Sequence, residues 1–318
     1  MTAVKTKFKS ISRAAYDSFR GTVFAGTVLL TAFGAQAQSL FVSDFETGDI
    51  YGFTPSGTQS TFASGLVSPA GLAFDSVGNL FVVDRNLNSS FVYAFTTQGF
   101  RTTIADGLNQ PDRLAFDSTG NLFVSDWGSG NIYEFTPSGV KSTFASGLIH
   151  PLDLAFNSAG NLFVANQVSG NIYEFTPSGV RSTFASGLST LSGLAFNSAG
   201  DLFVSTGGPP GTGYIYEFTP DGTQSTFASG LNLPIGLAFD GAGNLFEAER
   251  GTGSINKFTP DGTRSTFASG LSAPFGLAFQ DVTLPVPEPS VFGLLVLGAV
   301  AFLVRQRRCC VTASHQQA

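Results

Sequence analysis

The sequence has 318 residues, of which 42% are hydrophobic and 33 are phenylalanine, so the chain has ample material for a large core. Residues 38–285 hold eight basic and twenty acidic residues, a net charge of −12. This balance argues against nucleic-acid binding, which depends on Lys and Arg clusters that neutralise phosphates. Both cysteines, Cys309 and Cys310, lie at the C-terminal end, so no disulfide framework is expected in the rest of the chain.

Residues 1–37 have the pattern of a secretory signal peptide. Five basic residues lie in the first twenty, residues 21–34 form a mostly apolar run, and Ala35-Gln36-Ala37 fits an A-x-A cleavage site. The apolar run is shorter than the ~20 residues that a membrane span needs. We therefore expect export and cleavage after Ala37.

Residues 38–280 are built from a repeated unit of about forty residues. The Leu-Phe pair of each unit restarts at Leu40, Leu80, Leu122, Leu162, Leu202 and Leu245. Each unit contains four short runs rich in Phe, Val, Ile, Tyr and Thr, which are typical of β-strands. Asp/Asn-Ser-x-Gly-Asn separates the first two runs, and Thr-Pro-Ser/Asp-Gly separates the last two. Pro and Gly at these positions favour tight turns, so each unit is predicted to be a four-stranded antiparallel sheet.

Six such sheets arranged radially predict an all-β, six-bladed β-propeller. The repeats open on a second strand at Leu40–Ser43 and end on a first strand at Gly276–Phe279. We expect these N-terminal and C-terminal strands to share one blade, which would close the ring and remove the exposed sheet edges. Phenylalanines at the repeated positions are interpreted as packing between blades.

The pattern P-x-G-L-A-F-D-x-x-G-N-L-F-V, which begins at Pro69, resembles that of the NHL, streptogramin-lyase-like and gluconolactonase-like (TolB-like) six-bladed propellers. The resemblance covers about 240 residues. It implies the architecture but no single function, because one fold hosts many activities.

The C-terminal region resembles the PEP-CTERM sorting signal. A linker at 281–290 contains Val286-Pro287-Glu288-Pro289, a hydrophobic segment with an arginine cluster follows at 291–308, and a cytoplasmic tail is predicted at 309–318. The cluster consists of Arg305, Arg307 and Arg308, and arginines after an apolar run favour a cytoplasmic position for that end. The resemblance implies a transient stay in the inner membrane of a Gram-negative bacterium, processing by an exosortase-type enzyme, and delivery to the cell surface or extracellular matrix. A plain membrane anchor is the alternative.

The connections after the second and fourth strands vary among the repeats, and alternating strand direction predicts that they share one face. Loops on a rigid scaffold commonly carry function. We therefore predict a binding or display module for polysaccharide or a surface protein. The binding-face candidates are Asp84, Arg85, Asp126, Trp127, His150, Glu249 and Arg250. The residue after each second strand, such as Asp84 or Glu249, either caps a turn or helps to ring the channel with oxygen ligands for a cation.

The sequence contains no Ser/His/Asp or Cys/His combination that suggests nucleophilic catalysis, so neither catalytic residues nor a cofactor are predicted. The resemblance to gluconolactonase-like proteins implies a channel metal, but of the six matching positions only Asp112 has a ligating side chain, which makes it a weak metal candidate. Two alternatives stay open. One is a metal-dependent lactonase or lyase around Asp112, Asp126, His150 and Glu249, and the other is a purely structural repeat protein of the matrix.

Overall fold

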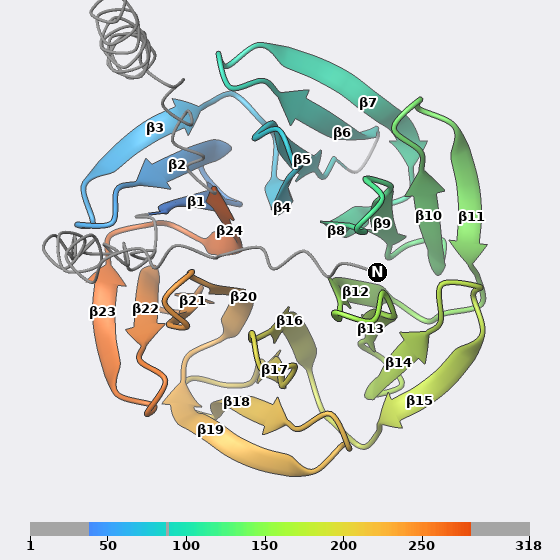
Figure 1. Ribbon diagram of the computed structural model, residues 1–318. Helices are drawn as coiled ribbons and strands as arrows, with labels where there is room; N and C mark the ends of the chain where they lie inside the picture. Colours follow the sequence, from blue (N-terminus) through green and yellow to red (C-terminus); the bar gives the residue numbers. More distant parts are fainter. Residues whose placement is uncertain (1–37, 87–88, 281–318) are drawn as a thin grey trace, which may run out of the picture. The chain divides into compact units, whose positions relative to one another are not determined.

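The computed structural model describes residues 38–86 and 89–280, and these residues form six four-stranded antiparallel sheets around a central axis (Figure 1). Each sheet is one blade of a β-propeller, as the repeat period predicts. Within a blade the strands run in order from the axis to the rim. The described residues contain no helix long and apolar enough to span a membrane.

Blades are numbered from the one that contains the first strand. Blade 1 consists of β24 (Pro274–Gln280), β1 (Ser39–Asp44), β2 (Asp49–Phe53) and β3 (Gln59–Ala63). Blade 2 consists of β4 (Pro69–Phe74), β5 (Leu80–Asp84), β6 (Ser90–Phe95) and β7 (Arg101–Leu108). Blade 3 consists of β8 (Pro111–Phe116), β9 (Leu122–Asp126), β10 (Asn131–Phe135) and β11 (Lys141–Ala145).

The remaining blades follow the same plan. Blade 4 consists of β12 (Pro151–Phe156), β13 (Leu162–Asn166), β14 (Asn171–Phe175) and β15 (Arg181–Ala185). Blade 5 consists of β16 (Leu191–Phe196), β17 (Leu202–Thr206), β18 (Gly213–Phe218) and β19 (Gln224–Leu231). Blade 6 consists of β20 (Pro234–Phe239), β21 (Leu245–Glu249), β22 (Ser254–Phe258) and β23 (Arg264–Ala268).

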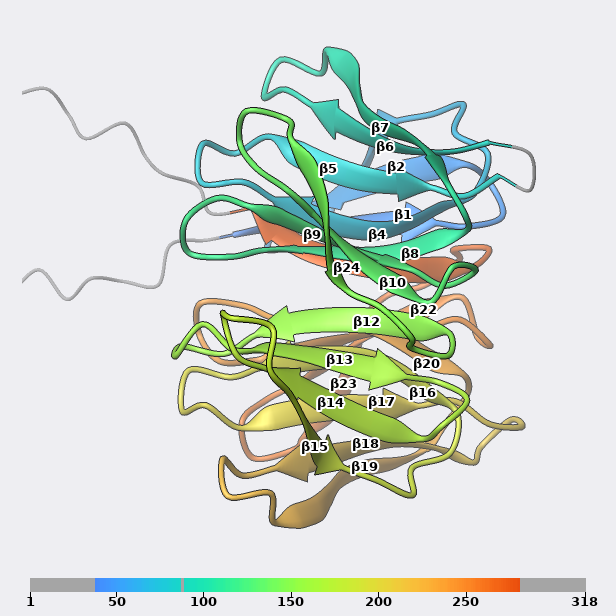
Figure 2. The ribbon, with the colours of Figure 1, turned by 90° about the vertical axis from the view of Figure 1, so that its right-hand side faces the viewer.

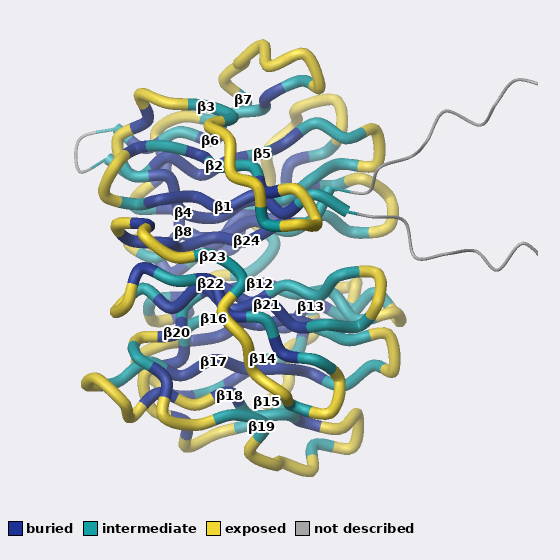
Figure 3. Tube along the Cα trace, turned by 90° about the vertical axis from the view of Figure 1, so that its left-hand side faces the viewer, coloured by how far each residue is buried: buried dark blue, intermediate teal, exposed yellow. Residues whose placement is uncertain are grey.

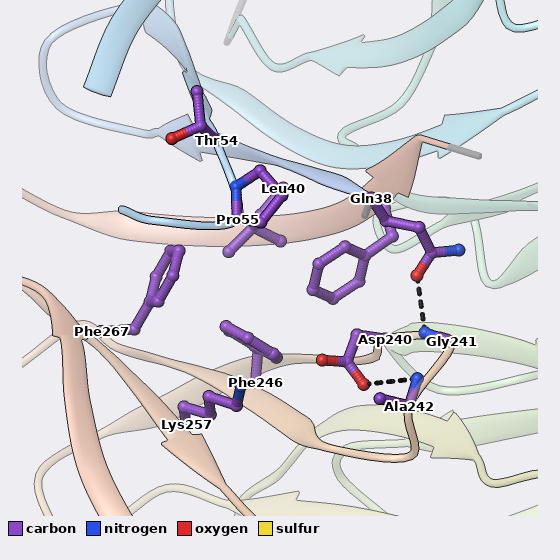
Figure 4. Close-up of a pocket in the computed structure, with 11 residues that line it drawn as sticks. Gln38, Leu40, Thr54, Pro55, Asp240, Gly241, Ala242, Phe246, Lys257 and Phe267 are labelled. Carbon is purple, nitrogen blue, oxygen red and sulfur yellow. Dashed lines mark hydrogen bonds between the residues drawn. The ribbon is translucent and has the colours of Figure 1, made fainter. Parts of the chain in front are cut away.

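Blade 1 closes the ring by joining the two ends of the repeat region. β24 pairs antiparallel with β1, with Ser39 opposite Gln280 and Leu40 opposite Phe279, which confirms the predicted closure. Figure 4 shows the groove of about 150 Å³ where blades 6 and 1 meet, with Phe246 and Phe267 on one side and Leu40 on the other. The closed ring leaves no inner strand without a neighbouring blade.

Phenylalanine rings hold adjacent blades together. The Phe of the second strand in each blade contacts the Phe near the end of the inner strand in the next blade. The two rings meet edge to face, with centroids 4.9–5.1 Å apart and an interplanar angle of 73–82°. Such aromatic pairs add about 0.5–1.5 kcal/mol each beyond the area that they bury. The six pairs are Phe41–Phe74, Phe81–Phe116, Phe123–Phe156, Phe163–Phe196, Phe203–Phe239 and Phe246–Phe279. The interpretation of these phenylalanines as inter-blade packing is confirmed.

The disc has two different faces. We call the face that carries the repeated turns the turn face. The first and last described residues lie there: Gln38 accepts a hydrogen bond from Gly241 N, and Gln280 Nε2 donates to Gly78 O, and both glycines belong to these turns. Figure 2 shows the start of β1 and the end of β24 on the same side. The connections after second and fourth strands lie on the opposite face, which we call the variable face.

Burial decreases from the axis to the rim (Figure 3). The inner strand β4 is mostly buried, whereas the outer strand β3 has three exposed residues followed by two half-buried ones. The inner strands are therefore accessible to a ligand only at their ends, where they reach the two faces of the disc.

Candidate functional site at the mouth of the central channel

The inner strands differ most where they enter the channel from the variable face. Each contains the same Leu-Ala-Phe sequence, but the two residues before that sequence change from blade to blade. They are Ala70-Gly71, Asp112-Arg113, Leu152-Asp153, Ser192-Gly193, Ile235-Gly236 and Phe275-Gly276. Charge is therefore confined to blades 3 and 4 in a ring that is otherwise small or apolar.

Buried ion pairs join these charged residues. Arg85 Nη1 lies 2.7 Å from Asp112 Oδ2, and Asp112 is 1% exposed. Arg113 is also buried, with Nε 3.8 Å from Asp153 Oδ1 and Nη1 3.8 Å from Asp112 Oδ1. An uncompensated buried charge costs several kcal/mol, roughly 3–5 when one partner is removed. These four side chains thus depend on one another.

Asp153 also connects two neighbouring blades. Its Oδ1 accepts the N–H of Leu154 on β12, and its Oδ2 accepts the N–H of Leu194 on β16, both at 2.8 Å. Burial raises the pKa of Asp153, while the positive charge of Arg113 and the two amide hydrogen bonds oppose the rise. The carboxylate therefore lies in the channel wall with both oxygens already engaged.

Two phenylalanine rings and a third arginine complete the channel mouth. The ring of Phe45, after β1, packs on Phe275 of β24 at a centroid distance of 5.2 Å. The guanidinium of Arg113 lies 4.2 Å from the Phe275 centroid, and that of Arg250 lies 5.4 Å from Phe45. Contacts of this kind between a cation and an aromatic face are worth about 0.5–2 kcal/mol. Arg250 also reaches Glu46, at 3.8 Å.

Three predicted binding-face residues, Asp84, Asp126 and Glu249, are buried and bond to backbone. Each accepts the N–H of the loop that leads into the inner strand of its own blade, at distances of 2.8–2.9 Å. Such side-chain acceptors satisfy loop amides that would otherwise lack a partner. In the structure these three side chains position the variable-face loops, and any contact with a ligand stays a prediction.

The pKa values of these three carboxyls differ in direction. Burial raises the pKa of Asp84 and of Asp126, despite hydrogen bonds from backbone amides that act in the opposite sense. Burial also acts to raise the pKa of Glu249, but the Thr252 hydroxyl and the Asn232 amide outweigh it and hold that pKa below its ordinary value. The Glu249 carboxylate is further paired with Arg264 at 2.9 Å.

Trp127 and His150 form an aromatic pair on the variable face above blades 3 and 4. Their rings stack at a centroid distance of 3.7 Å and an angle of 14°, and Trp127 Nε1 donates to Gln167 Oε1 at 3.4 Å. Trp127 is half-buried, while Ile149 and Val168 beside these residues in the chain are more than 50% exposed. We call Trp127, Ile149, His150, Gln167 and Val168 the Trp127 platform.

The metal candidate and the alternative enzyme set are not assembled in the structure. The Asp112 carboxylate is paired with Arg85, and the described residues contain no group of three or more His, Cys, Asp or Glu that could hold a metal ion. Asp112 and Asp126 belong to blade 3, His150 precedes β12 of blade 4, and Glu249 belongs to blade 6. The metal-dependent enzyme around these four residues therefore stays a prediction.

The larger grooves that the structure shows lie on the turn face. One groove, of about 450 Å³, lies between blades 2 and 3, and another, of about 460 Å³, lies between blades 5 and 6. Both are lined by the repeated turns and inter-blade phenylalanines, such as Phe116 and Phe239. Because these residue types recur in every blade, the grooves follow from the repeat and do not mark a particular site.

Sequence reasoning missed Arg113, Asp153, Phe45 and Phe275 as members of the channel mouth. A signal was present, because these positions break an otherwise regular repeat. Of the predicted candidates, the structure brings Arg85 and Arg250 to this mouth and places Trp127 and His150 in the neighbouring platform. The cleavage position Ala37 and the sorting residues Pro287, Glu288, Pro289, Arg305, Arg307 and Arg308 lie outside the described residues.

Comparison with known proteins defines the class of fold first. Three solved structures share the propeller: a gluconolactonase-like protein (TM-score 0.60, 19% identity, 74% of this chain and 87% of that one), streptogramin B lyase (0.59, 16%, 76% and 84%), and virginiamycin B lyase from Staphylococcus aureus (0.53, 15%, 65% and 73%). At such identities the likeness shows the fold alone. The chain is thus a six-bladed propeller similar to these proteins.

The C-terminal region gives the more particular finding. Residues 285–308 match the family model of the PEP-CTERM protein-sorting motif. The motif implies export, recognition by an exosortase-type processing enzyme, and a cell-surface or extracellular destination. No curated protein matches the chain.

Proposed function

We propose that the chain is a surface-displayed binding module that holds an extracellular polysaccharide on its variable face. The observation that supports this proposal is where the blades differ. The turn face repeats almost unchanged, whereas the charged channel mouth and the Trp127 platform occur once and lie on the variable face. This difference among the blades favours a binding role over a purely structural one.

The position of Gln280, the last described residue, supports the same orientation. Gln280 lies at the turn face, and the chain continues from there towards residues 281–318. A sorting segment attached at the turn face leaves the variable face free to contact the surroundings. In a Gram-negative bacterium that exports polysaccharide, this face would meet the extracellular matrix.

An aromatic platform favours a polysaccharide over a protein partner. The indole ring of Trp127 is large, flat and apolar, which suits stacking against a sugar ring, and its N–H is already bonded to Gln167. Gln167 and His150 add hydrogen-bonding groups beside it. A protein partner is the alternative outcome of the binding experiment.

Replacing Trp127 by alanine is expected to weaken binding of the full-length protein to extracellular polysaccharide from the producing cells by about tenfold or more, because large aromatic residues dominate such interfaces. Co-sedimentation with the purified polysaccharide measures the change. The matched control is Phe100→Ala, which removes a 72% exposed aromatic residue after the blade 2 turn. Equal binding by the wild type and the Trp127 variant, or retention only by the protein fraction of the matrix, would refute the polysaccharide proposal.

Sorting is tested separately from binding. Glu288→Ala in the Pro287-Glu288-Pro289 motif is expected to leave most of the protein unprocessed and in the inner membrane, because the motif is what the processing enzyme recognises. Cell fractionation with an antibody to the propeller reads out the size and location. Glu217→Ala on β18 serves as the control, and normal release of the Glu288 variant would contradict the sorting proposal.

A further inference from the structure

We propose that the channel mouth binds the carboxylate of an acidic sugar unit, held between Arg113 and Arg250. The inference rests on the proposed function and names the class of polysaccharide, one that contains uronic acid. Two guanidinium groups at the mouth, those of Arg113 and Arg250, have no acceptor at hydrogen-bonding distance among the described residues.

Arg113 is the first of these groups. The residue is 5% exposed, and its Nη1 is buried without a hydrogen-bond partner among the described residues. Asp112 Oδ1 lies 3.8 Å from this nitrogen, and Asp153 Oδ1 lies 3.8 Å from Arg113 Nε. Both distances exceed the 2.7–2.9 Å of a charge-assisted hydrogen bond. Buried donors in native proteins are nearly always paired, so an acceptor is expected to reach this nitrogen.

The neighbouring carboxylates are already engaged elsewhere. Asp112 is paired with Arg85 at 2.7 Å, and Asp153 accepts two backbone N–H groups. Among the described residues, no carboxylate therefore lies within hydrogen-bonding distance of the Arg113 guanidinium.

Arg250 is the second group, and it lies against the same aromatic ring. Its guanidinium is 6.0 Å from the Phe275 centroid, and that of Arg113 is 4.2 Å from it. Its only ion pair in the described part of the chain is with Glu46, at 3.8 Å, and Glu46 is largely exposed. Two guanidiniums beside one ring, each with donors to spare, suit a carboxylate, which accepts from planar arginine forks.

The channel has room for the carboxylate but not for a polymer. A cavity of about 100 Å³ is lined by Arg113, Asp153, Gly236, Gly276 and six leucines, one from each inner strand. Its volume is roughly three times the ~30 Å³ that one water molecule occupies in the liquid. Because Arg113 lines this cavity and Arg250 does not, the carboxylate is expected at the entrance of the cavity, with its sugar ring at the mouth. There the carboxylate oxygens of Glu46 can accept bonds from sugar hydroxyls.

The Trp127 platform continues from this site. Trp127 N donates to Gln110 O, two residues before Asp112, and His150 lies three residues before Asp153 on the chain that enters β12. The two inner strands that carry the channel charges therefore begin directly below the stacked rings. A polysaccharide with its acidic unit at the channel mouth would place a following unit on the platform.

The test compares methyl galacturonide with methyl galactoside, which differ in the carboxylate, by calorimetry on the full chain in mild detergent. The galacturonide is expected to bind at least about tenfold tighter, and Arg250→Gln to remove at least about tenfold of its affinity, as expected for a hydrogen-bonded charge. Arg113→Lys keeps the charge but loses the fork, and should weaken binding as well. The control is Arg181→Gln, which removes a cation stacked on Tyr173 at the rim and should leave the affinity for the galacturonide unchanged.

Each other result overturns the inference. Equal affinity for the two sugars, or galacturonide affinity unchanged in Arg250→Gln, would show that the guanidiniums do not hold a carboxylate. Inorganic phosphate binding as tightly as the galacturonide would point to a general anion site. If Trp127→Ala weakens binding of the whole polysaccharide while the galacturonide fails to bind, only this inference fails. If neither effect is seen, the proposed function fails with it.

Discussion

Replacing Glu247 by glutamine is expected to remove much of the pH dependence of the protein's stability between about pH 5 and 8. Glu247 on β21 is fully buried, and burial raises its pKa to about 8. The charge of Glu249 adds to the rise, whereas a hydrogen bond from Asn256 Nδ2, at 2.8 Å, and the charge of Arg264 oppose it. Glu247 Oε1 has no hydrogen-bond partner among the described residues.

The sign of the effect follows from proton binding. The folded-state pKa of about 8 lies above the ordinary value of 4.5, so the folded state binds more protons than the unfolded state within that window. The free energy of unfolding therefore falls as the pH rises, by about 1.4 kcal/mol per pH unit and roughly 4 kcal/mol in all. Glutamine keeps the Asn256 hydrogen bond and has no proton to lose, so its advantage over glutamate should grow with pH.

Urea unfolding at several pH values measures this difference, with Glu217→Gln as the control, a half-buried glutamate on β18, the third strand of blade 5. The control should follow the wild type at every pH. A Glu247→Gln variant that keeps the slope of the wild type would show that another group causes the pH dependence.

Replacing Phe246 by alanine is expected to lower the free energy of unfolding by about 3–5 kcal/mol, the usual cost of removing a buried aromatic ring. Phe246 is 3% exposed and contacts Phe267 and Phe279 edge to face, each at a centroid distance of 5.0 Å. It lies at the junction of blades 6 and 1 (Figure 4), so the substitution weakens the contact between the two blades where the ring closes.

Denaturant unfolding again supplies the measurement. The control is Phe100→Ala, which removes an exposed ring and should change stability by no more than about 0.5 kcal/mol. Similar values for the two variants would mean that the inter-blade rings do not determine the stability of the disc.

The architecture could be predicted from the sequence because the same pattern of strands and turns occurs in six repeats. The turn residues predict the hairpins, and the offset between Leu40–Ser43 and Gly276–Phe279 predicts the closure that pairs β1 with β24. Periodicity works here because each blade must bury the same face against an equivalent neighbour, so local pattern and tertiary packing agree.

The site was harder to predict because its residues are exceptions to the repeat. Arg85 and Asp112 are far apart in the sequence, and only the fold brings their charges to 2.7 Å. Glu247 and Asn256 stand opposite each other where the other five blades pair Val with Tyr, as at Val164 and Tyr173. Aligning the repeats and marking the positions that depart from the consensus would have found both sets, although not their hydrogen bonds.

The pairing of β24 with β1 has a mechanical consequence. β24 runs from the variable face at Pro274 to the turn face at Gln280. Tension between a polymer held on the variable face and the chain beyond Gln280 acts along this strand. The hydrogen bonds to β1 lie perpendicular to the strands, so the pull loads all of them together in shear instead of opening them one at a time. The strand that closes the ring is thus also the one through which the disc would resist detachment.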